Sequence, residues 1–259
     1  MSWGVLCNSM LLQIKQSFVR PMFRFCLFAN PILNTILLYE MYRNSDENNF
    51  MAYVVLGAGM MGLWSCICFS SAGDINRERY SGTLVLIFAA PISFQSIILG
   101  KILGNTVLSL TTLAISLVTA VILFQVPLML ESPLLFVMAL VGAVIAFVVI
   151  SSVIACVLTL SRKTELYMNC IEIPVALLCG FVFPVSILPK AVQVMCYALS
   201  PTYAVELLRM AIWGVDDVGL FWNKFGMMIV ITTLYAILSV FLYRRIDRRV
   251  RIAATLEVA

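Results

Sequence analysis

The chain has 259 residues, of which 62% are hydrophobic and 12% charged, and its formal net charge is +4. A soluble domain has about half apolar and about a quarter charged residues. A water-soluble core could not absorb this excess of apolar side chains, so we expect an all-α polytopic membrane protein. The sequence contains no histidine, which removes the usual general base and the commonest metal ligand and argues against an intramembrane enzyme.

The eight cysteines mostly fall inside hydrophobic runs. Cys66 and Cys68 could be taken for a pair of metal ligands, but a zinc site needs more ligands than two. Small hydrophobic residues in a membrane helix are the better interpretation of this pair. We therefore expect no metal site and no disulfide framework.

The first segment, residues 3–20, is amphipathic. Apolar residues from Trp3 to Phe18 recur at helical spacing, which is typical of a helix lying in the membrane interface. An ordinary packed helix is the alternative. Pro21 should end this helix. The segment lacks an unbroken apolar run followed by a cleavage site, so we do not expect a cleavable signal peptide.

Six hydrophobic stretches follow, and each could cross a bilayer of about 30 Å, which needs roughly 20 residues. They cover residues 22–42, 50–71, 102–124, 134–160, 166–188 and 220–243. Between the last two, the segment 189–219 contains two amphipathic pieces, Ala191–Leu199 and Tyr203–Ile212, which are too short to span. We expect these pieces to form re-entrant or interfacial helices, and residues 1–259 to form a single transmembrane domain.

Most of the 17 basic residues lie on the side that holds the N-terminus, residues 72–101, residues 161–165 and the tail. The positive-inside rule places that side, with both termini, in the cytosol. An even number of spans agrees with this orientation. The basic tail, Arg244–Arg251, is interpreted as a topology anchor, with binding of anionic lipid as the alternative.

The segment 72–101 is the longest polar interruption on the basic side. It opens with the charged residues Asp74, Arg77, Glu78 and Arg79. We expect a short helix that begins near Asp74, ends at Gly82 and presents its charges to the cytosol. Such a helix could dock on a soluble partner through charge pairs and apolar anchors. The apolar candidates are Leu84, Leu86, Ile87 and Phe88. A plain charged hairpin is the alternative, although it would need far fewer residues.

The run Glu78–Leu84, followed by Ala90-Pro91 and Gly100-Lys101, resembles the cytosolic signature of the ABC-type-2 export permeases. The order of the expected elements is also similar to that family: an N-terminal amphipathic helix, six spans, and short re-entrant helices before the last span. The run Leu199–Tyr203, with Arg209 after it, looks like the outer segment of the same family.

This resemblance implies an ABC exporter in which two permease subunits, identical or related, form a path between them. Two ATP-binding cassette subunits would dock beneath and carry the ATP and Mg. The residues implicated in coupling are Asp74, Arg77, Glu78, Arg79, Gly82, Thr83, Pro91 and Lys101. This chain has no G-x-x-x-x-G-K-[ST] motif, so we expect no cofactor in it. The other expected partner is membrane lipid, and we do not expect nucleic acid as a partner. The expected location is a bacterial plasma membrane.

Polar residues inside the spans suggest a substrate path. Asn30 and Asn34 share a helix face, and Glu172 lies inside the fifth span with Asn169 on the same face. Met60 and Phe181 are candidates for the lining of an apolar cavity, although such residues more often pack against other side chains or face lipid. Glu172 could instead pair near the interface.

The exported substrate would be hydrophobic or amphipathic: a drug, an antimicrobial peptide, a lipid or a lipid-linked glycan. The alternative function is an ion-coupled secondary transporter or channel that uses Glu172. Many secondary transporters contain inverted repeats, and we find none in this sequence.

Overall fold

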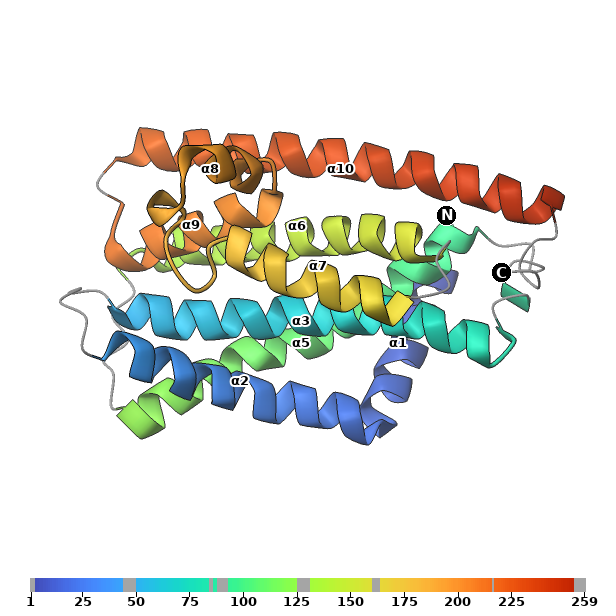
Figure 1. Ribbon diagram of the computed structural model, residues 1–259, viewed down its shortest axis with the longest axis horizontal. Coiled ribbons are helices and arrows are strands. Elements are labelled where there is room, and N and C mark those ends of the chain that lie inside the picture. Colours follow the sequence, from blue (N-terminus) through green and yellow to red (C-terminus); the bar gives the residue numbers. More distant parts are fainter. Residues whose placement is uncertain are drawn as a thin grey trace.

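A computed structural model describes residues 3–43, 50–83, 86–87, 93–124, 131–159, 164–215 and 217–253. These residues form helices and connecting turns, with no strand among them. In chain order the helices are α1 (Trp3–Val19), α2 (Pro21–Tyr42), α3 (Phe50–Tyr80), α5 (Phe94–Phe124), α6 (Pro133–Thr159), α7 (Thr164–Leu178), the 3-10 turn η1 (Val185–Ile187), α8 (Lys190–Tyr197), α9 (Ser200–Trp213) and α10 (Val218–Ala253). Figure 1 shows the long helices side by side, with α1 at one end of the bundle and α8 and α9 at the other.

Helix α3 lies at the centre of the bundle and contacts α2, α5, α6, α7 and α9 (Figure 1). Its Trp64 is fully buried. The indole ring packs edge-on against Phe147 of α6, at 5.8 Å between ring centroids, and against Phe181, at 6.5 Å. Edge-to-face packing of this kind is favourable for aromatic rings. The main core is therefore built around the middle of α3.

Helix α1 ends where the sequence predicts. Pro21 occupies the first turn of α2, where its missing N–H costs nothing, and the axes of α1 and α2 meet at 74°. A β-carbon added at Gly104 of α5 would lie 2.8 Å from the backbone oxygen of Met10. Small residues at helix contacts allow such close approach. The result is that α1 lies directly against the first turns of α5.

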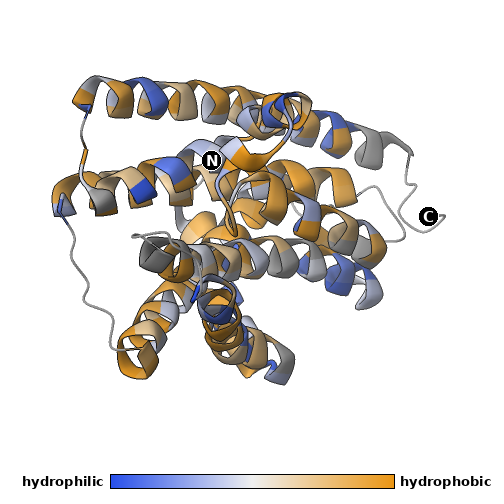
Figure 2. Cartoon of the chain, turned by 60° about the vertical axis from the view of Figure 1, so that its left-hand side comes forward, coloured by the Kyte–Doolittle hydropathy of each residue, from blue (hydrophilic) through white to orange (hydrophobic). Residues whose placement is uncertain are grey.

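Four described helices, α3, α5, α6 and α10, are long and apolar enough to cross a membrane, and the bent α1–α2 pair would make a fifth span. Figure 2 shows that hydrophobic residues cover most of the length of these helices.

The span predicted at residues 166–188, the fifth in the sequence analysis, is wrong in its extent. Helix α7 has only 15 residues, and the chain then turns at Gly180, where φ is +74°. A left-handed backbone favours glycine and ends the helix there.

The predicted start of the polar helix near Asp74 is also wrong. Helix α3 runs without a break from Phe50 to Tyr80, and α5 begins at Phe94 rather than at residue 102. The predicted end is confirmed, because the chain turns at Gly82 with φ +69°. Beyond this turn, the described residues Thr83, Leu86 and Ile87 are helical. Pro91, Leu84 and Phe88 lie outside the described residues.

The two short helices expected before the last span are present as α8 and α9. The break between them falls at Ala198 and Leu199, with Pro201 in the first turn of α9, where proline is best tolerated. Helix α10 then continues from Val218 into the basic tail as far as Ala253.

Candidate functional site

A network of polar side chains joins α1, α3 and α5 at the α1 end of the bundle. Its centre is Asp74 of α3, whose side chain is only 1% exposed. The Asp74 carboxylate accepts hydrogen bonds from Gln13 of α1, from Asn105 of α5 at 3.0 Å and from Arg20 at 2.8 Å. The prediction that Asp74 faces the cytosol is wrong. The reason is that three neighbouring groups satisfy its charge inside the bundle, and a buried charge needs such partners.

The same network includes contacts that do not involve Asp74. Gln13 donates to Ser17 at 2.8 Å and to Asn105 at 3.0 Å, and Ser17 donates to Asn105 at 3.0 Å. We call Gln13, Ser17, Arg20, Asp74, Arg77 and Asn105 the inner polar network. Gln13 and Ser17 were not singled out as site residues from the sequence. Their spacing of four, on the face of α1 that turns out to be buried, is the signal that could have found them.

A second set of contacts joins the last turn of α3 to α5 and α6. Lys101 of α5, which is 6% exposed, forms an ion pair with Glu78, and Thr83 also donates to the Glu78 carboxylate. Arg79 donates to the backbone oxygen of Thr159 on α6. Arg77 donates to Gln16 on α1 at 3.0 Å. Most of the predicted coupling residues are therefore bonded within the chain.

The exposed part of this region is the turn after α3. Tyr80 is 82% exposed and Leu86 is 68% exposed, and Ser81 and Gly82 between them are also exposed. Beside this turn lies an open depression of about 530 Å³ between α1 and α3. Its lining residues are Lys15, Gln16, Val19, Arg20, Arg77, Glu78, Ser81 and Thr83. We call the turn and the depression the α3 tip.

A cleft opens between α2, α3 and α7. One hollow of about 340 Å³ is lined by Arg20, Phe23, Cys26, Asn30, Gly62, Ser65, Cys66, Gly73, Arg77 and Glu172. A second hollow, of about 180 Å³, shares Asn30, Ser65 and Glu172 with the first, and Asn34 also lines it. We call the two hollows together the α2–α3–α7 cleft. It is a concave site of the size and mixed lining that small-molecule sites have.

Glu172 is half-buried in this cleft, on α7. Its carboxylate accepts a hydrogen bond from the Ser65 hydroxyl, and its backbone oxygen accepts one from the Trp64 indole at 3.3 Å. Asn34 donates to Asn30 at 3.2 Å on the facing side. The structure thus brings together three of the residues predicted for the substrate path, Asn30, Asn34 and Glu172.

Two of the other predicted path residues, Met60 and Phe181, are not among the described residues that line the cleft. Met60 and Phe181 are fully buried in the main core, where they pack against other apolar side chains. Asn169 belongs to α7, but its side chain is outside the described set. Met60 and Phe181 therefore pack in the core, which is the alternative that the sequence left open for them.

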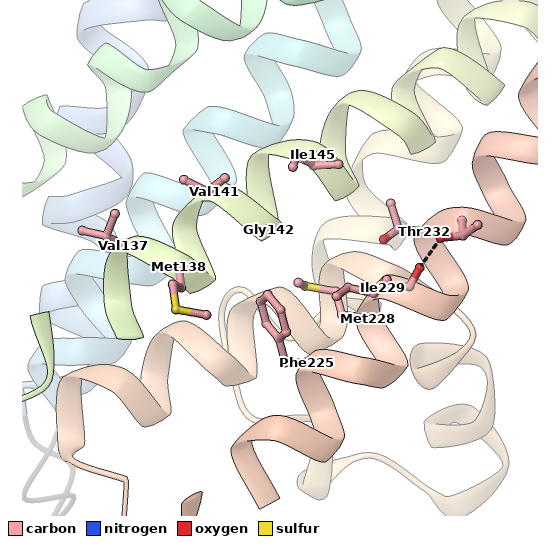
Figure 3. A pocket seen from close by; sticks show the side chains of 10 residues that line it. Val137, Met138, Val141, Gly142, Ile145, Phe225, Met228, Ile229 and Thr232 are labelled. Atoms are coloured by element: carbon pink, nitrogen blue, oxygen red, sulfur yellow. Dashed lines mark hydrogen bonds between the residues drawn. The ribbon is translucent and has the colours of Figure 1, made fainter. Parts of the chain in front are cut away.

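A third hollow, of about 470 Å³, lies between α6 and α10 (Figure 3). Its lining is mainly aliphatic and aromatic, as the side chains of Val141, Ile145 and Phe225 in Figure 3 illustrate. Its polar groups are Thr232 and Thr233, and Thr233 bonds back to the oxygen of Ile229 at 2.8 Å. The hollow has no charged lining residue among those described, in contrast to the α2–α3–α7 cleft.

At the opposite end of the bundle, Arg209 of α9 is 4% exposed and holds the turn after α7. It donates to the backbone oxygens of Gly180 at 2.7 Å and Phe181 at 3.1 Å. Nearby, Lys224 pairs with Glu206 at 2.8 Å, and Tyr197 donates to Glu206 at 3.0 Å. Burial and then the Glu206 carboxylate raise the pKa of Tyr197 to about 12, so its hydroxyl remains a neutral donor near pH 7.

The eight cysteines are free thiols. Among the described residues, no three His, Cys, Asp or Glu side chains gather closely enough to hold a metal ion. Cys26 and Cys66 line the α2–α3–α7 cleft, but they contribute thiols to its wall and not a ligand set.

Comparison with protein families matches the description ABC-2 type transporter over residues 6–213, from α1 through α9. The chain belongs to the ABC-2 type transporter family. Its resemblance to this family, carried by the residues around Glu78 and Gly82, is therefore confirmed. No curated protein matches the chain. Within an ABC transporter, this membrane domain is the permease component and not the catalytic one, and the family implies an ATP-binding cassette partner.

Proposed function

We propose that this permease subunit belongs to an exporter, in which two permease subunits and two ATP-binding cassette subunits act together. ATP and Mg would be bound by the cassette subunits. The transported compound would be hydrophobic or amphipathic, such as a drug, an antimicrobial peptide, a lipid or a lipid-linked glycan. The assembly would lie in a bacterial plasma membrane, with both termini of this chain in the cytosol, as the distribution of basic residues favours.

One observation carries this proposal. The α3 tip exposes a tyrosine and a leucine, and ion pairs and hydrogen bonds join the last two turns of α3 to three other helices. Glu78 pairs with Lys101 of α5, Asp74 bonds to α1 and α5, and Arg79 bonds to α6. A partner that pushes on the tip would therefore move α1, α5 and α6 together with α3.

The charges around the tip suggest what the partner presents to it. Lys15, Arg20 and Arg77 line the depression with one carboxylate, Glu78, and Lys101 already pairs with that carboxylate. An acidic surface on the cassette subunit would be complementary to this lining. Complementary charges speed association and set the orientation of docking. Leu86 and Tyr80 would supply the apolar contacts at the centre of the docking surface.

The α2–α3–α7 cleft is the proposed substrate path. Helices α2 and α7 also carry exposed apolar side chains, among them Phe25, Leu33 and Ile173. By resemblance to the family, we expect the second permease subunit to contact the first and fifth predicted spans, residues 22–42 and 166–188, which contain α2 and α7. A second copy or a related subunit placed there would cover the cleft and convert it into an enclosed path.

The experiment that tests the proposal is co-purification with an ATP-binding cassette subunit after co-expression, followed by ATPase measurement in nanodiscs. Leu86→Glu places a charge on the exposed tip and should reduce recovery of the complex about tenfold or more. Leu134→Glu is the matched control, because Leu134 is also highly exposed, at 75%, but lies in the first turn of α6 at the opposite end of the bundle. Equal recovery with both variants would contradict docking at the α3 tip.

The ion-coupled alternative makes a different prediction. It requires transport that follows an ion gradient without ATP and depends on Glu172. Family membership favours ATP as the energy source. Reconstituted transport that needs no cassette subunit would reverse this preference.

A further inference from the structure

Glu172 differs from three other buried or half-buried carboxylates in the bundle, Asp74, Glu78 and Glu206. Asp74 has Arg20 within 2.8 Å, Glu206 has Lys224 within 2.8 Å, and Glu78 pairs with Lys101. Within the part of the chain that the structure describes, Glu172 has no cationic partner, and only the Ser65 hydroxyl bonds to its carboxylate. A carboxylate withdrawn from water without a counter-charge is costly. A positive group brought by a ligand would remove that cost.

The walls around Glu172 are suited to the apolar part of such a ligand. Phe23, Cys26 and Cys66 line one hollow of the cleft, and Trp64 and Leu177 line the other. Asn30 lies in both hollows and offers an amide oxygen as a further acceptor. A small aromatic or aliphatic body with one positive charge is the chemistry that this combination fits.

The charges at the α1 end of the cleft indicate from which side a cation would approach Glu172. Arg20 and Arg77 line the cleft at the α1 end, and both lie near one carboxylate, Asp74, at 2.8 and 3.5 Å. Two guanidiniums against one carboxylate leave a positive surplus at this end, so a cation would enter more readily through the second hollow, whose described lining residues include no basic side chain. Glu172 is the carboxylate among the described residues that line this second hollow.

We propose that the α2–α3–α7 cleft recognises amphipathic organic cations, with the positive group paired to Glu172 and the apolar body against Phe23 and Cys26. This rests on the proposed function for its biological use, because it names the substrate class of the proposed path. The binding step itself needs no ATP-binding subunit.

The test uses the full chain in nanodiscs of zwitterionic lipid and two probes of the same shape and opposite charge. Equilibrium binding of tetraphenylphosphonium should be measurable, and that of tetraphenylborate should be weaker. Glu172→Gln should weaken tetraphenylphosphonium binding about tenfold to hundredfold, as expected for the loss of a charged partner. Glu40→Gln is the matched control, since Glu40 is an exposed carboxylate at the far end of α2. It should leave binding unchanged.

Two further measurements do not depend on how well Glu172→Gln folds. A β-carbon at Gly73 would meet no atom within 4 Å, although this residue lines the cleft. Gly73→Leu should therefore occupy part of the first hollow and reduce binding, since its β-carbon does not meet a neighbouring helix. In the wild type, tetraphenylphosphonium should slow modification of Cys26, which also lines the cleft, by a thiol reagent, as followed by mass spectrometry.

The proposal is overturned if tetraphenylborate binds as well as tetraphenylphosphonium, or if folded Glu172→Gln binds the cation like the wild type. It is equally overturned if the cation gives Cys26 no protection. These outcomes are separate from the proposed function. A chain that forms an active complex with a cassette subunit but fails these tests is an ABC permease for another class of substrate.

Discussion

At the scale of single residues, the inner polar network is the feature that the sequence did not predict. Its contacts join positions far apart in the chain: Gln13 and Asp74 are separated by 61 residues, and Gln13 and Asn105 by 92. Local spacing carries no information about such pairs. It places Asp74 beside other charges and so indicates a solvated face. The packing of α1 onto α5 decides instead that Asp74 is buried.

A double-mutant cycle measures the central pair of this network. Asp74→Asn leaves Arg20 without its carboxylate and should cost about 3 kcal/mol of stability, the lower range for breaking a buried pair, since Arg20 is partly exposed. Arg20→Gln alone should cost a similar amount, and the double variant should cost less than the sum. Thermal unfolding in detergent provides the comparison. Strictly additive effects would show that the two side chains do not stabilise each other.

At the scale of the elements, the sequence predicted well where apolar periodicity was continuous. The ends of α2 and α6 and the presence of α8 and α9 agree with expectation. The prediction failed at α3, where an apolar span and the polar segment after it form one continuous helix. The apolar stretch and the helix end at different residues. The prediction also failed at α7, where the turn at Gly180, held by Arg209, stops a hydrophobic run.

The contact between α1 and α5 can be tested by adding one methyl group. Gly104→Ala should destabilise the protein by about 1–3 kcal/mol, because the new β-carbon would lie 2.8 Å from a backbone oxygen that cannot move aside cheaply. Gly226→Ala on α10 is the matched control. Nothing lies within 4 Å of a β-carbon there, so this change should be neutral or stabilise by up to about 1 kcal/mol. If the two variants unfold at the same temperature, the close packing of α1 on α5 is wrong.

At the scale of the whole molecule, the bundle has two chemically different ends. One end carries α1, the α3 tip and the basic end of α10; the other carries α8 and α9 (Figure 1). The sequence predicted this division from the distribution of basic residues. It could not indicate that the cleft and the polar network would adjoin, because that depends on the 74° bend between α1 and α2.

Reporter fusions would test the orientation. A phosphatase domain that is active only outside the cytosol should be inactive when fused after Ala253. The same domain should be active when inserted between Gly214 and Asp217, at the α9 end. The reverse pattern would place the α3 tip outside the cell and would contradict docking of an ATP-binding subunit there.

Arg20 and Arg77 belong to both regions, since they line the cleft and also approach Asp74. The opening of the cleft and the attachment of α1 therefore share the same two guanidiniums. An anionic solute that drew Arg20 away from Asp74 would directly weaken the attachment of α1 to α3. The two guanidiniums thus connect the opening of the cleft to the attachment of α1 without any intervening side chain.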